Sequence, residues 1–309
     1  YEKKIAILGS TGSIGQTTLD IIKENKKYYQ IDLLTTNKNF KKIYLQAKEF
    51  KVKNLIIHNT KIYNDKINFL RKKKFKVYKN IHEFNKNYKS KLDYTMCSIT
   101  GLNGLESTLE IISFTKKIAI ANKESIICAW SLIKKRLVKY NTIFVPVDSE
   151  HFSISHLLKN NSKNTVKNVY ITASGGPFLK LKNKKLKNFS PKNAVKHPTW
   201  RMGKKISVDS STLINKVYEL IEAKKIFNLK YSQLKIIVQP TSYVHGIVDF
   251  YNGTSQILIH PTSMKIPIYN SIVSEKRFVY LNHDFNIHKM NNLNFQKVDD
   301  KKFPIKEIL

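Results

Sequence analysis

Two kinds of hydrophobic pattern alternate along the first half of the chain. Short continuous apolar runs are separated by stretches in which apolar residues recur every three or four positions, as in TTLDIIKEN and SIICAWSLIKKRLVKY. The apolar runs predict strands at residues 3–8, 29–36, 54–59, 92–99, 116–121 and 142–147. Continuously apolar strands that alternate with amphipathic helices are typical of a parallel sheet covered on both faces.

The pattern changes after residue 150. Residues 166–174 predict a strand that ends in small residues, and the Lys- and Asn-rich stretch behind it has little apolar periodicity, so it predicts a mobile loop with one short helix. Residues 210–227 predict a helix. Residues 244–260 predict a hairpin, because two alternating strands flank the turn signal Asn252-Gly253.

The predicted fold class is therefore α/β, with two domains. A Rossmann-like parallel-sheet domain is expected over residues 1–149. An α+β catalytic domain is expected over residues 150–275, with a mobile lid loop at about 175–204. Residues 276–309 are polar and weakly patterned, which predicts a linker.

The apolar runs, the first residues and the two cysteines indicate the cellular compartment of the protein. No apolar run approaches the length of a membrane-spanning helix, and the first residues do not form a signal peptide. Cys97 and Cys128 both lie in apolar stretches, so both are expected to be packing residues in a reducing compartment. We expect a bacterial cytoplasmic protein, or a plastid one if a targeting segment has been removed, since the chain does not begin with Met.

The net charge of +33, from 55 basic and 22 acidic residues, raises the possibility of a nucleic-acid partner. Only four of the basic residues are Arg, the side chain that nucleic-acid readers favour, and the lysines are spread along the whole chain. We therefore expect no nucleic-acid and no membrane partner, with nucleic-acid binding kept as an alternative. The charge does favour phosphorylated small molecules.

A glycine triplet marks the first turn. Gly9, Gly12 and Gly15 lie between the first predicted strand and the first predicted helix, where glycine lets the backbone approach a pyrophosphate. The order of strand, turn and helix predicts a dinucleotide site. An NAD site usually has an acid at the end of its second strand, but this strand is followed by Asn37, Lys38 and Asn39, which favours NADPH.

Asp148 and Glu150 follow the strand predicted at 142–147. On an extended chain, residues two apart point to the same side, so the two carboxylates are expected to face together. They repel each other unless a cation or a proton lies between them. No His or Cys cluster lies nearby in the sequence, so a hard divalent ion such as Mg²⁺ or Mn²⁺ is the expected partner.

The predicted helix at 210–227 supplies a third carboxylate. Its polar side carries Asn215, Lys216 and Glu219, and we expect Glu222 to be an ordinary solvent-facing residue. Ser210 and Ser211 are expected at the helix start, where backbone N–H groups bind anions well. The apolar side is formed by Leu213, Ile214, Val217, Leu220 and Ile221. Such a polar face could bind phosphate and hydroxyl groups.

Taken in order, six stretches of the chain resemble the 1-deoxy-D-xylulose 5-phosphate reductoisomerase family. They are GSTGSIG (9–15), ANKES (121–125), PVDSEH (146–151), ASGGPF (173–178), HPTWRMGKKISVDSST (197–212) and NKVYE (215–219). The resemblance implies rearrangement of a linear sugar phosphate, followed by hydride transfer from NADPH to give 2-C-methyl-D-erythritol 4-phosphate, an isoprenoid precursor. It also implies a divalent metal (Mg²⁺ or Mn²⁺, with Co²⁺ as a further option) and a homodimer, whose interface could lie near the hairpin.

The resemblance also implies the site residues. The metal ligands would be Asp148, Glu150 and Glu219, and the catalytic set adds Lys123 and His197. The substrate would contact Lys123, Ser149, Glu150, Ser174, His197, Trp200, Ser210, Asn215, Lys216 and Glu219. The cofactor would contact Gly9, Ser10, Thr11, Gly12, Ser13, Ile14, Gly15, Asn37, Lys38, Asn39, Asn122, Glu124 and Gly203.

Three departures from the family pattern stand out. Gln239 stands where the family has His, and Val217 stands where the family tends to have Gly. The family continues into a C-terminal helical segment, which we expect to be lacking in this chain. Two other enzyme-like alternatives remain open. One is a semialdehyde-type dehydrogenase, which would need a catalytic Cys, and the other is a degenerate relative that binds ligands without turnover.

Overall fold

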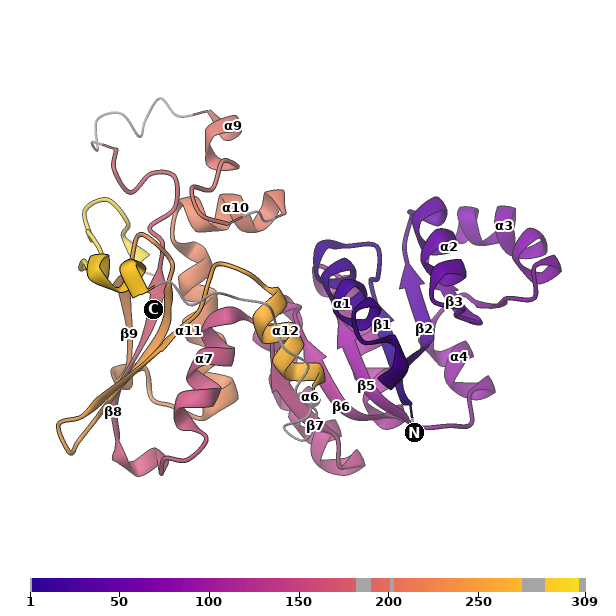
Figure 1. Ribbon diagram of the computed structural model, residues 1–309, viewed down its shortest axis with the longest axis horizontal. Helices are drawn as coiled ribbons and strands as arrows, with labels where there is room; N and C mark the ends of the chain where they lie inside the picture. Colours follow the sequence, from indigo (N-terminus) through magenta and orange to yellow (C-terminus); the bar gives the residue numbers. More distant parts are fainter. Residues whose placement is uncertain (1, 182–189, 201–202, 274–286, 306–309) are drawn as a thin grey trace. The chain divides into compact units, whose positions relative to one another are not determined.

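The computed structural model describes residues 2–181, 190–200, 203–273 and 287–305 (Figure 1). The chain divides into two compact units. Unit 1 comprises Tyr1–Val147 and Pro267–Val279, and unit 2 comprises Asp148–Ile266 and Tyr280–Leu309. Within the described ranges, no helix has both the length and the apolar character needed to span a bilayer.

Unit 1 is built on a seven-stranded sheet of order β4-β3-β2-β1-β5-β6-β7, in which all neighbours are parallel. The strands are β1 (Lys3–Leu8), β2 (Tyr29–Thr36), β3 (Asn54–Ile57), β4 (Lys76–Tyr78), β5 (Leu92–Cys97), β6 (Thr115–Ile120) and β7 (Ile143–Pro146). The strand order reverses between β1 and β5, which is where open α/β sheets bind their ligands. The parallel-sheet prediction is confirmed, although β4, only three residues long, was not predicted.

Asparagine side chains start four of the helices in unit 1. The carboxamide oxygens of Asn39, Asn59, Asn80 and Asn122 each accept a hydrogen bond from a backbone N–H three residues further on. This is a favoured N-cap arrangement. The helices are α1 (Ser13–Lys23), α2 (Phe40–Glu49), α3 (Thr60–Lys72), α4 (Ile81–Asn87), α5 (Leu105–Ile111), α6 (Lys123–Tyr140) and α12 (Lys265–Ile272), with short 3₁₀ turns at Lys26–Tyr28, Leu102–Gly104 and Ile112–Phe114.

The two cysteines differ in exposure. Cys97, at the end of β5, is buried as predicted, whereas Cys128 on α6 is exposed. The prediction of a packing role is therefore wrong for Cys128. Its apolar neighbours in the sequence alternate between the two sides of a helix, so a short apolar stretch does not by itself bury each member.

Unit 2 contains a four-stranded mixed sheet of order β11-β10-β8-β9. The strands are β8 (Val166–Ala173), β9 (Leu234–Val238), β10 (Val244–Phe250) and β11 (Ser255–Ile259); β8 and β9 are parallel and the other pairs antiparallel. The first strand and the hairpin are as predicted, whereas β9 was not predicted. Residues Ile154 of α7 (Ser149–Leu158) and Leu220 of α11 (Ile214–Phe227) share one core with the sheet, so both helices cover the same face.

The helix predicted at 210–227 is two helices. α10 (Lys204–Ser211) ends where Ser211 donates to the carbonyl oxygen of Val208, and Leu213 then adopts a left-handed conformation (φ 60°) before α11 begins. Hydroxyl side chains compete for backbone carbonyls in this way, and the Leu213 side chain is buried. Ser210 and Ser211 therefore end a helix instead of starting one. The short helix expected in the Lys-rich stretch is α9 (Pro191–Ala194).

The described part of the C-terminal stretch is packed into unit 2 in spite of its weak pattern. Phe303 and Ile305 are buried in a cluster with Val217 of α11, and Gln296 forms a β-bridge with Val238. The ammonium of Lys302 donates to the carbonyl oxygen of Leu179 (2.7 Å). Two isolated apolar residues are enough to anchor a segment that has no helical or strand periodicity. Short 3₁₀ turns lie at Lys163–Thr165, Tyr231–Gln233 and Ile287–Asn292.

Candidate active site

The glycine triplet forms a tight turn directly after β1. Gly9 has φ +83°, and the Gly12 N–H donates to the Gly9 carbonyl oxygen (3.1 Å). A Cβ on Gly15 would lie 2.5 Å from the Gly9 carbonyl oxygen, so only glycine lets α1 begin this close to the turn. Gly12 is the N-cap of α1, and no side chain caps the helix at this end. Backbone N–H groups in the first turn of a helix are the donors that a phosphate uses.

The hydroxyl residues of this turn differ in their availability. Ser10 is fully buried, and its hydroxyl donates to the Gln46 side chain (2.8 Å). Thr11 pairs with the Thr36 hydroxyl (3.0 Å), and Ser13 is exposed at the start of α1. Ser10 therefore fixes the turn to α2 through its hydroxyl and to Thr35 of β2 through its backbone N–H (3.0 Å).

Asn37, Lys38 and Asn39 are exposed on the loop after β2. The Asn39 side chain is committed to capping α2. Asn122 is buried and spans two loops, because its side-chain amide donates to the carbonyl oxygens of Ile99 (2.6 Å) and Gly101 (2.7 Å).

Lys123 and Glu124 follow Asn122 in the first turn of α6 and are half-buried. Asn122 therefore serves as the residue that aligns α6 with the loop after β5.

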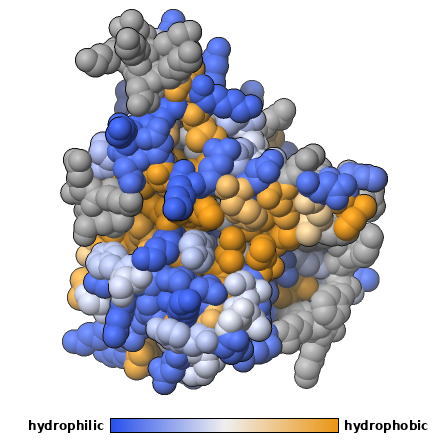
Figure 2. All heavy atoms as spheres, turned by 90° about the vertical axis from the view of Figure 1, so that its left-hand side faces the viewer, coloured by the Kyte–Doolittle hydropathy of each residue, from blue (hydrophilic) through white to orange (hydrophobic). Residues whose placement is uncertain are grey.

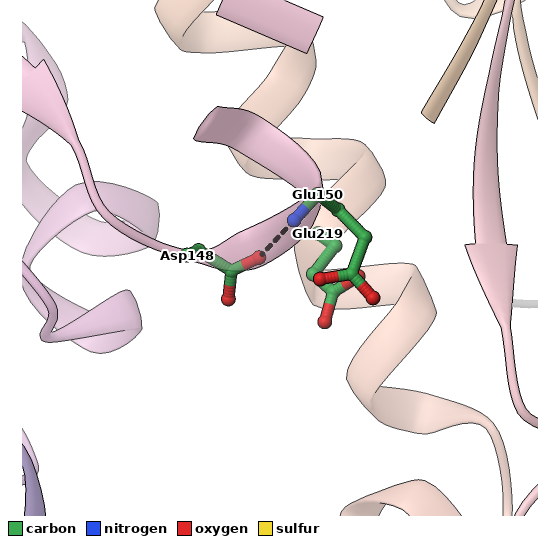
Figure 3. A group of neighbouring side chains, drawn as sticks. All are labelled: Asp148, Glu150 and Glu219. Atoms are coloured by element: carbon green, nitrogen blue, oxygen red, sulfur yellow. Dashed lines mark hydrogen bonds between the residues drawn. The ribbon is translucent and has the colours of Figure 1, made fainter. Parts of the chain in front are cut away.

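Three carboxylates converge in unit 2 (Figure 3). Asp148, Glu150 and Glu219 each offer an oxygen, and these atoms all lie within 4.8 Å of one another. Asp148 is the N-cap of α7, where it accepts a hydrogen bond from the Glu150 N–H (3.3 Å), and Glu219 comes from α11. The premise of an extended chain at 148–150 is therefore wrong: the two acids meet because one caps the helix that carries the other.

Lys216 is the internal cation of this cluster. Its ammonium forms ion pairs with Glu150 and with Glu219 (2.7 Å to the latter). Burial alone would lower the pKa of Lys216, but the charges of Glu150, Glu219 and Asp148 outweigh burial, so the pKa lies above its usual value. The lysine stays charged and compensates part of the negative charge.

The carboxylates have further neutral partners. Ser149 donates to Glu150, and Asn215 donates to Glu219. The His151 ring, which sequence reasoning did not single out, bonds through Nε2 to the Glu219 backbone carbonyl (2.9 Å) and so joins α7 to α11. An all-oxygen set of this spacing suits Mg²⁺ or Mn²⁺ better than a softer metal.

The prediction that Glu222 faces solvent is wrong, because only 1% of this residue is exposed. Asn215, Lys216 and Glu219 are also buried. The reason is that α11 is covered on both sides: the sheet and α7 lie against one side, and a second cluster with Val217 lies against the other. The helical pattern identified a polar side but could not show that this side is inside the unit.

A second polar group surrounds Ser174, at the end of β8. The Nδ1 atom of His197 accepts hydrogen bonds from the backbone N–H groups of Thr199 (3.3 Å) and Trp200 (2.9 Å). The ring proton is therefore on Nε2, which donates to the Ser174 hydroxyl oxygen (3.0 Å). That oxygen also accepts from the Gly176 N–H, so the Ser174 proton is directed to another acceptor.

The remaining predicted residues lie on the same unit. Ser210 is buried, and a Cβ on Gly176 would lie 2.6 Å from its carbonyl oxygen, so the end of α10 is close to the Ser174 loop. Trp200 makes an edge contact with His245 (5.9 Å between centroids). Gly203 is the exposed N-cap of α10. The predicted lid includes residues 182–189 and 201–202, which lie outside the described residues.

The chain combines a parallel sheet that has a glycine turn at its switch point with three acids whose oxygens lie within 4.8 Å of one another. This combination is typical of a class, the dinucleotide-dependent oxidoreductases that use a divalent metal. Comparison with known families specifies it further. Residues 5–130 match the family model for 1-deoxy-D-xylulose 5-phosphate reductoisomerase, and residues 144–227 match that for its C-terminal domain.

Individual proteins of the same family are also similar to this chain. The chain is 55% identical to the 1-deoxy-D-xylulose 5-phosphate reductoisomerase of Pelagibacter ubique (strain HTCC1062) over 99% of this chain and 80% of that protein. It resembles the solved structure of the Zymomonas mobilis enzyme in complex with NADPH (TM-score 0.88, 33% identity, 98% and 79% coverage). It also resembles a DOX-P reductoisomerase solved with NADPH, fosmidomycin and magnesium (TM-score 0.89, 31% identity, 99% and 78% coverage). The chain belongs to the 1-deoxy-D-xylulose 5-phosphate reductoisomerase family.

Removing the Lys216 charge should unbalance the acid cluster. We expect Lys216→Met to lower the free energy of unfolding by about 3–5 kcal/mol, because it leaves buried carboxylates uncompensated. Added Mg²⁺ should recover more stability in this variant than in the unchanged protein. Urea unfolding with and without Mg²⁺ measures both effects. Lys224→Met, at an exposed position of α11, is the control, and equal losses in the two variants would contradict the role of Lys216.

The hydrogen bonds of His197 predict its titration. Burial, with a smaller effect of the Lys216 charge, lowers the pKa of His197 to about 4. Its contribution to stability is therefore complete above the unfolded value of about 6.5 and is lost as the pH falls towards 4. Nitrogen NMR of labelled histidine, assigned with His197→Asn, should show a neutral ring protonated on Nε2 at about pH 6. A proton on Nδ1, or a midpoint near 6.5, would contradict this assignment.

Proposed function

We propose that this chain converts 1-deoxy-D-xylulose 5-phosphate into 2-C-methyl-D-erythritol 4-phosphate, with NADPH as reductant and a divalent metal as cofactor, in isoprenoid precursor biosynthesis. The observation that carries the proposal is the convergence of Asp148, Glu150 and Glu219 from two helices of unit 2. The bacterial relatives favour a cytoplasmic location over a plastid one.

The glycine turn of unit 1 is the proposed site of the cofactor pyrophosphate, which would lie against the backbone between Gly9 and Gly15. Lys38, exposed on the loop after β2, would pair with the 2′-phosphate and so distinguish NADPH from NADH. The bound nicotinamide supplies the hydride. Lys123 and Glu124, in the first turn of α6, are the proposed residues nearest to the reduction step.

The three carboxylates are the proposed metal ligands, because one oxygen of each lies within 4.8 Å of the other two. When bound, a divalent ion polarises the substrate carbonyl and stabilises developing negative charge. Within the protein, Ser149 and Asn215 orient the Glu150 and Glu219 carboxylates through hydrogen bonds. Because these hydrogen bonds already fix the two carboxylates, less side-chain entropy is lost when the substrate binds.

The substrate phosphate is proposed to bind near Ser174. The Ser174 hydroxyl is a poised donor, because its oxygen already accepts from His197 and from the Gly176 N–H. Ser210, Asn215 and Lys216 would complete the anion site, and Trp200 would cover the carbon backbone of the substrate. His197 would act here as a neutral hydrogen-bond donor, in line with its lowered pKa.

Turnover can be tested by following the absorbance of NADPH with 1-deoxy-D-xylulose 5-phosphate, with and without Mg²⁺. Glu150→Gln and Glu219→Gln should each lower kcat at least about a hundredfold, because one lost charged ligand weakens both metal binding and electrostatic stabilisation. NADPH affinity should change less than about twofold. Glu49→Gln, on the surface of unit 1, should retain full activity. Metal-independent turnover, or full activity in both site variants, would exclude the proposal.

We further propose that the protein is a homodimer formed through the outer face of the unit 2 sheet. Tyr170, Ile247 and Ile257 are cross-strand neighbours on this face, and Ile257 is 45% exposed. Figure 2 shows hydrophobic residues gathered in the middle of the side on which β8 and β9 lie. A second copy would cover this apolar row as an isologous interface does.

Ile257→Lys should dissociate the dimer, because it places two like charges in an apolar contact that a two-fold axis repeats. Sedimentation velocity over a concentration series measures the change. Leu45→Lys, at an exposed apolar position of α2, adds the same charge elsewhere and should leave the mass unchanged. A monomeric unchanged protein, or a dimer that survives Ile257→Lys, would contradict the proposed interface.

A further inference from the structure

The turn after β9 is held by one buried carboxamide. Gln239 is fully buried, and its Oε1 atom accepts hydrogen bonds from the backbone N–H groups of Tyr243 (2.8 Å) and Val244 (3.4 Å). Its Nε2 donates to the Thr241 hydroxyl (2.6 Å). The Gln239 backbone N–H donates to the carbonyl oxygen of Ala173 (2.7 Å). One residue therefore closes the turn and fastens it beside Ser174.

The turn holds Ser242 in an unusual conformation. Ser242 has φ +52°, a left-handed value that is unfavourable for a residue with a Cβ. Its backbone N–H donates to the Gln239 carbonyl oxygen (3.0 Å), and the residue is almost fully buried. Such conformations persist where the surrounding hydrogen bonds determine them, and they concentrate at functional sites. Here the surrounding bonds are those of Gln239.

The Ser242 hydroxyl faces the segment that carries His197. Its oxygen lies 3.1 Å from the hydroxyl oxygen of Thr199. Thr199 also donates its backbone N–H to His197, whose Nε2 bonds to Ser174. A continuous series of hydrogen bonds thus runs from the Gln239 turn through Ser242 and Thr199 to the proposed phosphate donor.

We propose that Gln239 is a positioning residue for the sugar phosphate. It fixes Ser242 where the Ser242 hydroxyl anchors Thr199, and this contact holds His197 in the orientation that leaves the Ser174 proton free for the phosphate. The inference rests on the proposed function for the identity of the substrate, but not for the anion site itself. Gln239 acts through Ser242 and Thr199 and does not contact the reacting atoms.

The choice of Gln over the His of the family pattern has a consequence. In this turn the Gln239 carboxamide accepts two hydrogen bonds and donates one, and it does so at every pH near neutrality. A neutral imidazole has one acceptor and one donor, and a protonated one has donors only. In this chain the turn is therefore insensitive to pH. Gln239→His would keep one acceptor and one donor in a fully buried position, where desolvation disfavours the charged ring. We therefore expect Gln239→His to weaken phosphate binding already at neutral pH, because one of the two backbone N–H groups loses its acceptor.

Anion binding can be tested directly with inorganic phosphate. The chain has two tryptophans, so Trp130→Phe leaves Trp200, next to Thr199, as the only indole reporter of the segment. In this background we expect Gln239→Leu, Ser242→Ala and Thr199→Val each to weaken phosphate binding about three- to tenfold. A three- to tenfold loss of phosphate affinity corresponds to the net free energy of about one hydrogen bond. Thr254→Val, in the exposed hairpin turn, is the matched control.

A double-variant cycle separates positioning from general loss of structure. Ser242→Ala and Thr199→Val together should cost no more than either alone, because they remove the same contact. With the sugar phosphate, KM should rise by a similar factor while kcat and NADPH affinity stay within about twofold. Additive effects, unchanged phosphate affinity in Gln239→Leu, or no phosphate response in the unchanged protein would each overturn the inference.

Loss of turnover and loss of positioning remain distinguishable. If the unchanged protein binds phosphate but does not oxidise NADPH, the proposed function fails and the phosphate cycle still decides the role of Gln239. Ser242→Ala and Thr199→Val remove only small groups, so these two variants test the positioning contact even if Gln239→Leu does not fold.

Discussion

Buried opposite charges determine how unit 2 is built. Glu150 and Glu219 come from different helices, are nearly withdrawn from water, and share the ammonium of Lys216. A buried carboxylate without a partner costs several kcal/mol, so α7 and α11 cannot move apart without a large penalty. His151 adds a second tie, because its ring bonds to the backbone of α11 at Glu219 itself. The geometry that would hold a metal is thus also the geometry that joins the two helices.

Unit 1 depends on a steric constraint instead. The turn after β1 is so close to α1 and to the loop after β5 that a Cβ on Gly15 or on Gly9 would come within 3 Å of backbone atoms. Ser10 then fastens the turn to Gln46 of α2. A turn held in this way is rigid before any ligand arrives, which reduces the ordering that binding must provide.

Local patterns predicted most of the fold because most of its elements are defined locally. Continuous apolar runs identified six of the seven strands in unit 1, and the glycine spacing identified its turn. β4 was missed because a strand of three residues flanked by lysines is too short to show a period. β9, LKIIV, carries an apolar run as long as that of other predicted strands, and it was missed all the same. The break at Leu213 was missed because a leucine gives no signal that it will adopt a left-handed conformation.

The site was predictable to the extent that its chemistry is visible in residue types. Asp148 and Glu150 stand together in a chain poor in acids, and Glu219 belongs to a recognisable helical pattern. The burial of Glu222 could not be predicted, because only the tertiary structure shows that α11 is covered on both sides. His151 was missed for the same reason: its partner is a backbone carbonyl that lies 68 residues away in the sequence.

The two departures from the family pattern within the chain have physical explanations of different kinds. Val217 packs with Phe303 and Ile305, so a side chain at this position fills space that the C-terminal segment also helps to enclose. Gln239 instead preserves a set of hydrogen bonds, since its carboxamide meets two donors and one acceptor at once. A substitution in an apolar core is tolerated if the volume still fits, whereas a substitution in a buried, hydrogen-bonded turn is tolerated only if each polar partner is still satisfied.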